Sequence, residues 1–413
     1  MIPKVDQRPL LDGAARVAES LRSWARPAGD GLAWPARPSD DQVSPRLYSG
    51  TAGVVVFLTE AALALDDARL ADAARRGCRY LVESMHADGA SGLYMGIAGT
   101  GFALAEAGKR LGDAAAVDGA SAAFEEVRRR AEPVGAGVEW SPITDVVAGG
   151  AGTGLALLWA AERLGLSWAL DVAAAAGARL MQLARPAVGG LAWEMSPDYP
   201  RLMPNFSHGT AGVAYFLASL GRATGVERFV EAAVAGATHL QSIARTEGGG
   251  CLIHHDEPDG QDLYYLGWCH GPVGTGRLFH RLHEVTGESQ WREWLLRTGT
   301  SVLRSGAPEA RLPGFWNNQG QCCGTAGLGE YALSLHALTG HGEYLALAQR
   351  CASRVATKAT EDGRGLVWVH AENRTAPDDV AAQSGYMHGS AGIGSWLLHL
   401  DANLHRGPAP VVL

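Results

Sequence analysis

The sequence predicts an all-α protein in which seven helical hairpins close as an inner ring of helices inside an outer ring, an α/α toroid. Three observations lead to this fold class. A G-x-x-G motif followed by an apolar run occurs seven times. Successive copies are separated by 46 to 65 residues, which is the length of two helices and a loop. Glycine contributes 54 of the 413 residues, about twice its usual share, and it falls at fixed places.

Each motif marks the start of a helix. The first glycines of the seven copies are Gly50, Gly96, Gly149, Gly209, Gly271, Gly324 and Gly389. The run after each is apolar on nearly every side, so this helix must be surrounded by protein and belongs to the inner ring. Most of these runs stop at a glycine in the position that follows a helix C-terminus: Gly112, Gly165, Gly225, Gly287 and Gly340.

A second, amphipathic helix follows each inner helix. The clearest examples cover residues 68–85, 168–185 and 227–245, with charged residues on one stripe and Ala, Leu and Val on the other. A helix with one polar face must contact water, so these helices form the outer ring. A helix near residues 8–26 completes a set of seven inner and seven outer helices.

The loops before the inner helices also repeat. Segments of the form G-x-x-W at 31–34, 137–140, 190–193 and 365–368 predict short strands, and GFW at 314–316 is a shortened version. In a toroid these loops lie at one rim, where the motif glycines let neighbouring backbones approach closely. A residue just before a motif glycine therefore faces the central cavity, where chemistry can be assembled from distant positions.

Composition argues against several classes of protein. The 35 basic and 43 acidic residues give a net charge of −8 without any block of Lys or Arg, which argues against nucleic-acid binding. The first thirty residues lack the apolar core of a signal peptide, and we find no stretch with the pattern of a membrane span. We therefore expect one soluble, cytoplasmic domain over residues 1–413.

Two neighbouring motifs contain cysteine in the residues just before their first glycine. WCHG at 268–271 and QCCG at 321–324 belong to the fifth and sixth repeats, so Cys269, Cys322 and Cys323 can converge. Three thiolates with an open fourth position describe a catalytic zinc site, because structural sites fill all four positions. Two other interpretations stay open at this point. The cysteines can be buried small apolar residues, or Cys322 and Cys323 can form a redox-active vicinal disulfide.

The same rim offers candidate acids and bases. His208 directly precedes a motif glycine, and Asp145 lies four residues before another. His270 and His388 also stand directly before motif glycines. A histidine at a helix N-terminus is often only packed or hydrogen-bonded, but the convergence of the repeats favours a functional role for His208 most.

Three weaker clusters lie elsewhere: Cys251 with His254 and His255, His280 with His283, and Asp256 with Glu257 and Asp259. The first could hold a second metal ion, and the second is a pair one helical turn apart. The third could supply the paired carboxylates of a toroidal glycoside hydrolase. We favour structural roles for all three, because adjacent acids in a loop are usually solvated.

Over about residues 40–400 the chain resembles the lanthionine synthetase C-like (LanC-like) cyclases, on the strength of the seven G-x-x-G repeats, NFSHGTAG, GWCHGPVGTG and QCCGTAG. The resemblance implies an α/α toroid with one zinc ion bound by Cys269, Cys322 and Cys323. The third ligand is histidine in many members of the family. The resemblance also implies His208 and Asp145 as an acid/base pair, whereas the basic residue often found before W-C-x-G is missing from DLYYLGW.

The implied reaction is the addition of peptide cysteine thiols to dehydroalanine or dehydrobutyrine, which forms (methyl)lanthionine thioether rings. His208 is our first choice for the acid that protonates Cα and His270 the second, while Asp145 orients His208 or accepts the thiol proton. The substrate is a dehydrated precursor peptide, so we expect a separate dehydratase, or a kinase with a lyase, as partner. The alternatives are addition of an external thiol such as glutathione to dehydrated proteins, and a zinc-holding, peptide-binding scaffold without turnover.

Overall fold

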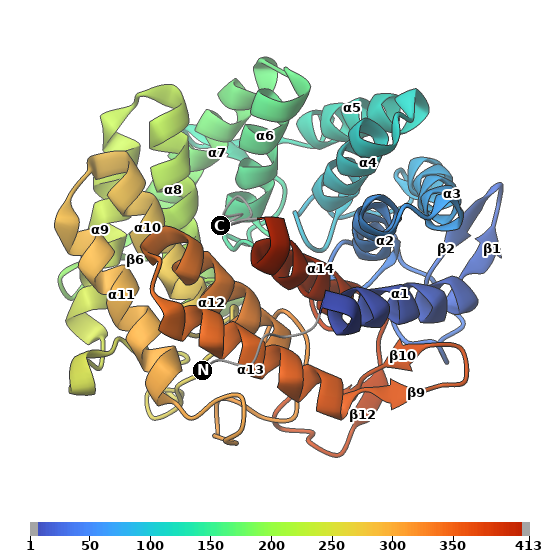
Figure 1. Cartoon of the computed structure of the whole chain (residues 1–413). Coiled ribbons are helices and arrows are strands. Elements are labelled where there is room, and N and C mark those ends of the chain that lie inside the picture. The colour runs from blue at the N-terminus through green and yellow to red at the C-terminus, as the bar shows by residue number, and fades with distance from the viewer. Residues whose placement is uncertain (1–6, 407–413) are drawn as a thin grey trace. The chain divides into compact units, whose positions relative to one another are not determined.

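A computed structural model describes residues 7–406, and in this range the chain forms fourteen α-helices (Figure 1). Seven of them start at the residue after the first glycine of a motif: α2 (Thr51–Leu65), α4 (Ile97–Leu111), α6 (Gly150–Leu164), α8 (Thr210–Thr224), α10 (Pro272–Thr286), α12 (Thr325–Thr339) and α14 (Ser390–Arg406). The other seven alternate with them: α1 (Gln7–Trp24), α3 (Ala68–Ser84), α5 (Ala114–Arg129), α7 (Trp168–Leu183), α9 (Glu227–Ile243), α11 (Ser289–Arg304) and α13 (Gly342–Lys358). The predicted helix pairs are confirmed.

The described chain divides into two compact units. The first contains residues up to 86, 103–119 and those from 303 onward, and the second contains 87–102 and 120–302. In the first unit α2 packs on α3, α12 on α13 and α1 on α14, and α14 also contacts both α12 and α2 (Figure 1). In the second unit α6 packs on α7 and α8 on α9, and α8 contacts both α6 and α10. Within each unit the inner helices are therefore neighbours.

Helix ends follow the glycine pattern of the sequence. The five glycines predicted to end inner helices all have positive φ, between 67 and 71°. In the first repeat no glycine is present, and Asp66 takes the left-handed conformation after α2 with a φ of 52°. These positions stop each inner helix and turn the chain into the next one.

The preceding loop caps six of the seven inner helices in the same way, and α10 is the exception because it begins with Pro272, which has no N–H. The N–H of Thr51 donates to the carbonyl of Ser44 (2.7 Å) and that of Ser390 to Gln383 (2.8 Å), in both cases seven residues back. A Cβ on the second motif glycine, as at Gly152, would overlap a carbonyl oxygen of this loop. At the motif glycines the nearest atom is usually a carbonyl of the helix's own loop, and Gly53 also lies against the backbone of Tyr386 in the neighbouring repeat. A glycine four residues before the first motif glycine also approaches the next repeat. Gly320, which precedes Gly324, is an example and lies against Met387.

The predicted short strands form antiparallel hairpins: β1 (Arg26–Ala28) with β2 (Gly31–Ala33), β3 (Glu132–Val134) with β4 (Gly137–Glu139), β5 (Arg185–Ala187) with β6 (Gly190–Ala192), and β9 (Thr360–Glu361) with β10 (Leu366–Val367). The tryptophan after each hairpin explains the repeated G-x-x-W. Its indole N–H donates to the carbonyl thirteen residues back, near the end of the outer helix, as in Trp34 to Leu21 (2.7 Å) and Trp368 to Val355 (2.9 Å). Each hairpin is thereby tied to an outer helix.

Two further hairpins precede α8 and α14. They are β7 (Glu194–Ser196) with β8 (Tyr199–Leu202), and β11 (Val369–Ala371) with β12 (Val380–Ala382). At the shortened GFW segment there is only a bridge between Leu312 and Phe315. The second hairpin of the last repeat carries residues into the site described below.

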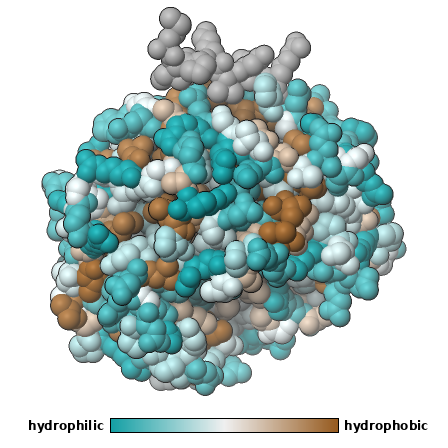
Figure 2. All heavy atoms as spheres, turned by 90° about the horizontal axis from the view of Figure 1, so that it is seen from below, coloured by the Kyte–Doolittle hydropathy of each residue, from teal (hydrophilic) through white to brown (hydrophobic). Residues whose placement is uncertain are grey.

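The surface is mixed in polarity. On the face drawn in Figure 2, hydrophobic residues are scattered among hydrophilic ones. Five large apolar side chains are exposed in the described residues: Leu63, Val188, Tyr199, Val369 and Val380. None of the helices within residues 7–406 has the length and apolarity needed to cross a bilayer.

An ionic cluster ties three inner helices of the first unit together. His399 on α14 lies 3.0 Å from Glu330 on α12 through Nδ1, and 3.4 Å from Glu60 on α2 through Nε2. Arg110 approaches Glu60 at 3.8 Å. Burial by itself lowers the pKa of His399, but the charges of Glu330 and Glu60 outweigh it and hold this pKa well above the ordinary value of 6.5. The imidazolium form is the one that the fold stabilises.

We expect His399→Gln to lower the free energy of unfolding by roughly 2 kcal/mol at pH 6, because two carboxylates lose a charged partner. A raised folded-state pKa gives stability that is complete below 6.5 and lost as the pH rises through that pKa. The difference between variant and wild type should therefore shrink in alkaline solution. Calorimetric melting at a series of pH values measures it. A stability difference that stays constant with pH would contradict a charged His399 in the ionic cluster. The control is Arg16→Gln, because Arg16 forms an exposed ion pair with Glu361.

Candidate metal and acid-base site

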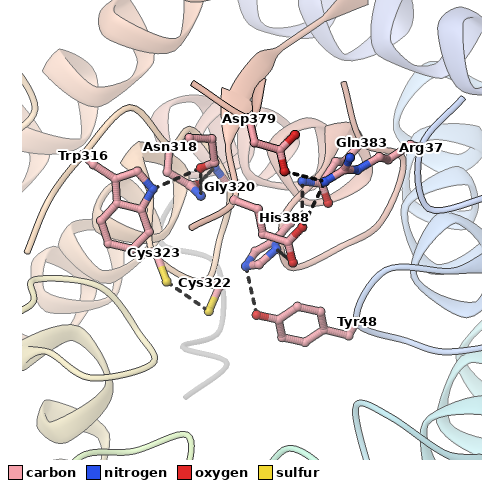
Figure 3. Close-up of polar contacts among 12 residues, drawn as sticks. Arg37, Tyr48, Trp316, Asn318, Gly320, Cys322, Cys323, Asp379, Gln383 and His388 are labelled. Carbon is pink, nitrogen blue, oxygen red and sulfur yellow. Dashed lines mark hydrogen bonds and ion pairs between the residues drawn. The ribbon is translucent and has the colours of Figure 1, made fainter. Parts of the chain in front are cut away.

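The three predicted cysteine ligands are reduced thiols and are buried, with 3 to 7% of each residue exposed. Cys269 lies just before α10, and Cys322 and Cys323 lie just before α12. They are the one group of three or more metal-binding side chains found in residues 7–406, and their sulfur atoms all lie within 4.8 Å of one another. The sulfur atoms of Cys322 and Cys323 are 3.4 Å apart, too far for a disulfide bond (Figure 3). This cysteine cluster could bind a metal ion.

The other three cysteines have a different chemistry. Burial raises the pKa of Cys78 and of Cys251 to about 12, and that of Cys351 still further. Thiols of this kind stay protonated and act as small apolar residues. Neither Cys251 nor its neighbours His254 and His255 join a second metal-binding group within the described part of the chain.

His208 and Asp145 lie side by side although 63 residues separate them. The Nδ1 atom of His208 is 2.7 Å from Oδ2 of Asp145, which is 1% exposed. The other carboxylate oxygen accepts the N–H groups of Ala148 (2.7 Å) and Gly149 (2.8 Å) at the start of α6. The helix start thus orients Asp145, and Asp145 orients the ring. With Nδ1–H directed at the carboxylate, Nε2 is the nitrogen left for proton transfer, and the side chain is 29% exposed.

His270, the second predicted acid, lies beside the first. Its ring centroid is 5.5 Å from that of His208, and it stacks on His255 at 4.1 Å. The ring of Tyr265, four residues before Cys269, meets His270 edge-on at 5.5 Å. The structure therefore adds His255 and Tyr265 to the surroundings of the predicted pair.

His388 belongs to a second histidine–carboxylate pair, in the first unit. Its Nδ1 is 3.1 Å from Glu372, which follows β11, and its Nε2 is 2.9 Å from the hydroxyl of Tyr48. Burial alone would lower the pKa of His388, but the neighbouring Cys322 and Glu372 raise it to about 9. Tyr48 was missed by sequence reasoning, although it stands two residues before a motif glycine, as Cys269 and Cys322 do.

Backbone hydrogen bonds explain why this register matters. In the first unit the N–H of Cys322 donates to Met387 (2.9 Å), and that of Met387 donates to Tyr48 (3.0 Å). In the second unit the N–H of Ser207 donates to Cys269 (2.9 Å). All of these residues stand two positions before a motif glycine. Successive repeats therefore set equivalent side chains next to one another, however far apart they are in sequence.

The acidic loop takes part in ion pairs. Asp256 lies 3.0 Å from Arg201, which also pairs with Asp259, and Glu257 lies 3.0 Å from His254. Carboxylates engaged in this way tie β8 to the loop before α10. Their partners support the structural interpretation over a pair of hydrolytic acids.

Comparisons with known proteins agree with this picture. The model of a family described as lanthionine synthetase C-like protein matches residues 41–406. Nisin cyclase, a solved structure, is 14% identical with a TM-score of 0.65, covering 97% of this chain and 94% of that one. The Lin0763 protein from Listeria innocua is 12% identical (TM-score 0.55; 96% and 98% covered), and the α-1,6-mannanase GH76A of Salegentibacter sp. HEL1_6 is 14% identical (0.54; 96% and 100%).

None of the curated proteins matches the chain in sequence. At these identities the likeness to solved structures concerns the fold. The all-α toroid expected from the repeats is confirmed by the match to nisin cyclase over nearly the whole of both chains.

Proposed function

The chain belongs to the lanthionine synthetase C-like family, and on that premise we propose that it is a zinc-dependent cyclase that forms thioether rings in a dehydrated peptide. The peptide's cysteine thiols add to dehydroalanine or dehydrobutyrine. The observation that carries the proposal is the buried group of Cys269, Cys322 and Cys323. The pair of His208 and Asp145 supports turnover rather than binding alone.

Zinc suits the residues present. Cysteine sulfur is a preferred ligand of Zn²⁺, whereas Mg²⁺ and Ca²⁺ take oxygen ligands. Three sulfur ligands leave a fourth position for the thiol of a substrate. Zinc held by Cys269, Cys322 and Cys323 would lower the pKa of that thiol, so that thiolate is present at neutral pH.

The protein's own residues would handle the proton. When the substrate sulfur bonds to Cβ, the π electron pair moves to give an enolate, which needs a proton at Cα. His208 is proposed to deliver it from Nε2, because Asp145 holds the opposite nitrogen. The carboxylate keeps this orientation because two backbone N–H groups fix its other oxygen. His270 is the second candidate for this acid.

The proposal includes partners and place. Water must leave serine or threonine before a thiol can add, and the chain has neither a phosphate-binding P-loop motif nor an evident kinase motif set. A separate dehydratase, or a kinase with a lyase, is therefore proposed to act first. We propose that the chain works in the cytoplasm, as one domain.

The test is to give the purified protein unmodified precursor with ATP, and then dehydrated precursor. We expect no reaction in the first mixture. In the second, free thiols should disappear without a change in peptide mass, because addition is an isomerisation. Mass spectrometry before and after alkylation of thiols measures both.

Other outcomes would contradict the assignment. Loss of water in the first mixture would make the protein a dehydratase. A mass gain of one glutathione, with the peptide thiols intact, would favour external thiol addition. Binding of the dehydrated peptide without loss of thiols would favour a scaffold.

A further inference from the structure

Tyr48, His388 and Glu372 of the first unit form a connected row, and Figure 3 shows Tyr48 and His388 beside Cys322. Glu372 contacts Nδ1 of His388 at 3.1 Å, and the hydroxyl of Tyr48 contacts Nε2 at 2.9 Å. Carboxylate, imidazole and hydroxyl thus follow the order seen in hydrolytic triads, with a phenol in place of serine. Tyr48 comes from the first repeat and the other two residues come from the last, so local chain geometry does not account for the row.

Further polar groups contact the row from behind. Glu372 is within 3.5 Å of the amide nitrogen of Gln383 and 3.9 Å of Arg37, which also lies 3.6 Å from Asp379 on the loop that precedes β12. The Tyr48 ring meets the His388 ring edge-on, with centroids 4.9 Å apart. A hydroxyl fixed in this way needs little reorganisation to bind a charge that develops next to it.

The backbone register brings Tyr48 close to the cysteine pair. The hydrogen bonds from Cys322 to Met387 and from Met387 to Tyr48 are two consecutive steps of one row. The His388 side chain lies between the two, because it contacts both the Cys322 thiol and the Tyr48 hydroxyl. A peptide whose sulfur adds beside Cys322 would therefore have its next residues near the Tyr48 hydroxyl.

We propose that Tyr48 is a further catalytic residue of this cyclisation, donating a hydrogen bond to the carbonyl oxygen conjugated with the dehydrated side chain. The inference rests on the proposed function. As the sulfur–carbon bond forms, the π pair shifts through Cα onto this oxygen, and the O–H of Tyr48 binds the enolate oxygen. Protonation at Cα by His208 then restores the carbonyl. Nε2 of His388 contacts the Tyr48 oxygen and holds it in place, and Glu372 positions His388.

The variant Tyr48→Phe removes one oxygen atom and tests this role. We expect kcat to fall by about 100-fold, the usual cost of one preorganised donor to a developing anion. KM should change by no more than about twofold, because the charge exists only in the transition state. Zinc content and melting temperature should match the wild type. Tyr344→Phe, which removes the hydroxyl of another buried tyrosine on the outer helix α13, should leave kcat unchanged.

A second variant separates positioning from packing. Glu372→Gln should lower kcat by about tenfold, as outer partners of a site commonly do. Combined with Tyr48→Phe it should cost nothing more, because Glu372 acts through the same hydroxyl. Wild-type kcat in Tyr48→Phe, or losses that multiply in the double variant, would overturn the inference. If the wild-type protein does not cyclise dehydrated peptide at all, the proposed function has failed instead.

Discussion

Cys322→Ala is expected to leave the purified protein without bound zinc and to slow thiol addition by about 1000-fold. The two remaining cysteines cannot hold a metal that needs three protein ligands at a catalytic site. Loss of the metal removes several kcal/mol of charge stabilisation, which corresponds to three orders of magnitude in rate. Metal analysis of the purified variant measures the loss of zinc, and X-ray absorption spectroscopy of the wild type shows whether sulfur atoms bind the metal.

The matched control is Cys351→Ala on the outer helix α13. Cys351 is fully buried and its pKa is raised by that burial, so it should not bind metal. The control should keep a full complement of zinc and normal turnover. Full zinc in Cys322→Ala, or an absorption edge without sulfur ligands in the wild type, would refute the metal centre.

His208→Asn is expected to lower turnover by on the order of 100-fold or more, with zinc content unchanged. The imidazole supplies the proton at Cα, and asparagine keeps a hydrogen-bonding side chain without an acid of suitable pKa. Asp145→Asn should also lower turnover, because the carboxylate that orients Nδ1 of His208 is lost. Turnover of dehydrated peptide and metal content are measured on the same preparations.

His239→Asn serves as the control. His239 is buried on the outer helix α9, and its Nδ1 likewise makes a hydrogen bond, in this case to the carbonyl of Val188. Its turnover should stay within about twofold of the wild type. Loss of zinc in His208→Asn would make His208 a ligand. Normal turnover in that variant would return it to a packing role.

Much of the fold could be predicted because each repeat contains residues that are needed for its own local structure. A second motif glycine such as Gly152 is required where a loop carbonyl lies against the helix start, and Trp34 is required where a hairpin is tied to a helix. The same structural requirement recurs in several repeats, so the same residue type recurs at equivalent positions in the sequence. Repetition is visible without a structure.

The row of Tyr48, His388 and Glu372 could not be predicted in the same way. Tyr48 and His388 are 340 residues apart, and Glu372 comes from a second hairpin that most repeats lack. His399, Glu330 and Glu60 present the same difficulty, because each comes from a different inner helix. Such contacts depend on which repeats are neighbours, and on side-chain directions that no local pattern encodes.

The packing of α1 against α14 has a consequence for how the protein is made. These are the first and last helices of the described chain, so α1 leaves the ribosome long before its partner exists. The ribosome adds about 5 to 20 residues per second, and α14 ends nearly 400 residues after α1 begins. The apolar side of α1 therefore stays without its partner for tens of seconds. The first unit also gathers three separate stretches of chain, whereas the second is made mostly from residues 120–302. The second unit can therefore fold during synthesis. The first unit can complete its packing only after α14 has been made, when α1 packs against it.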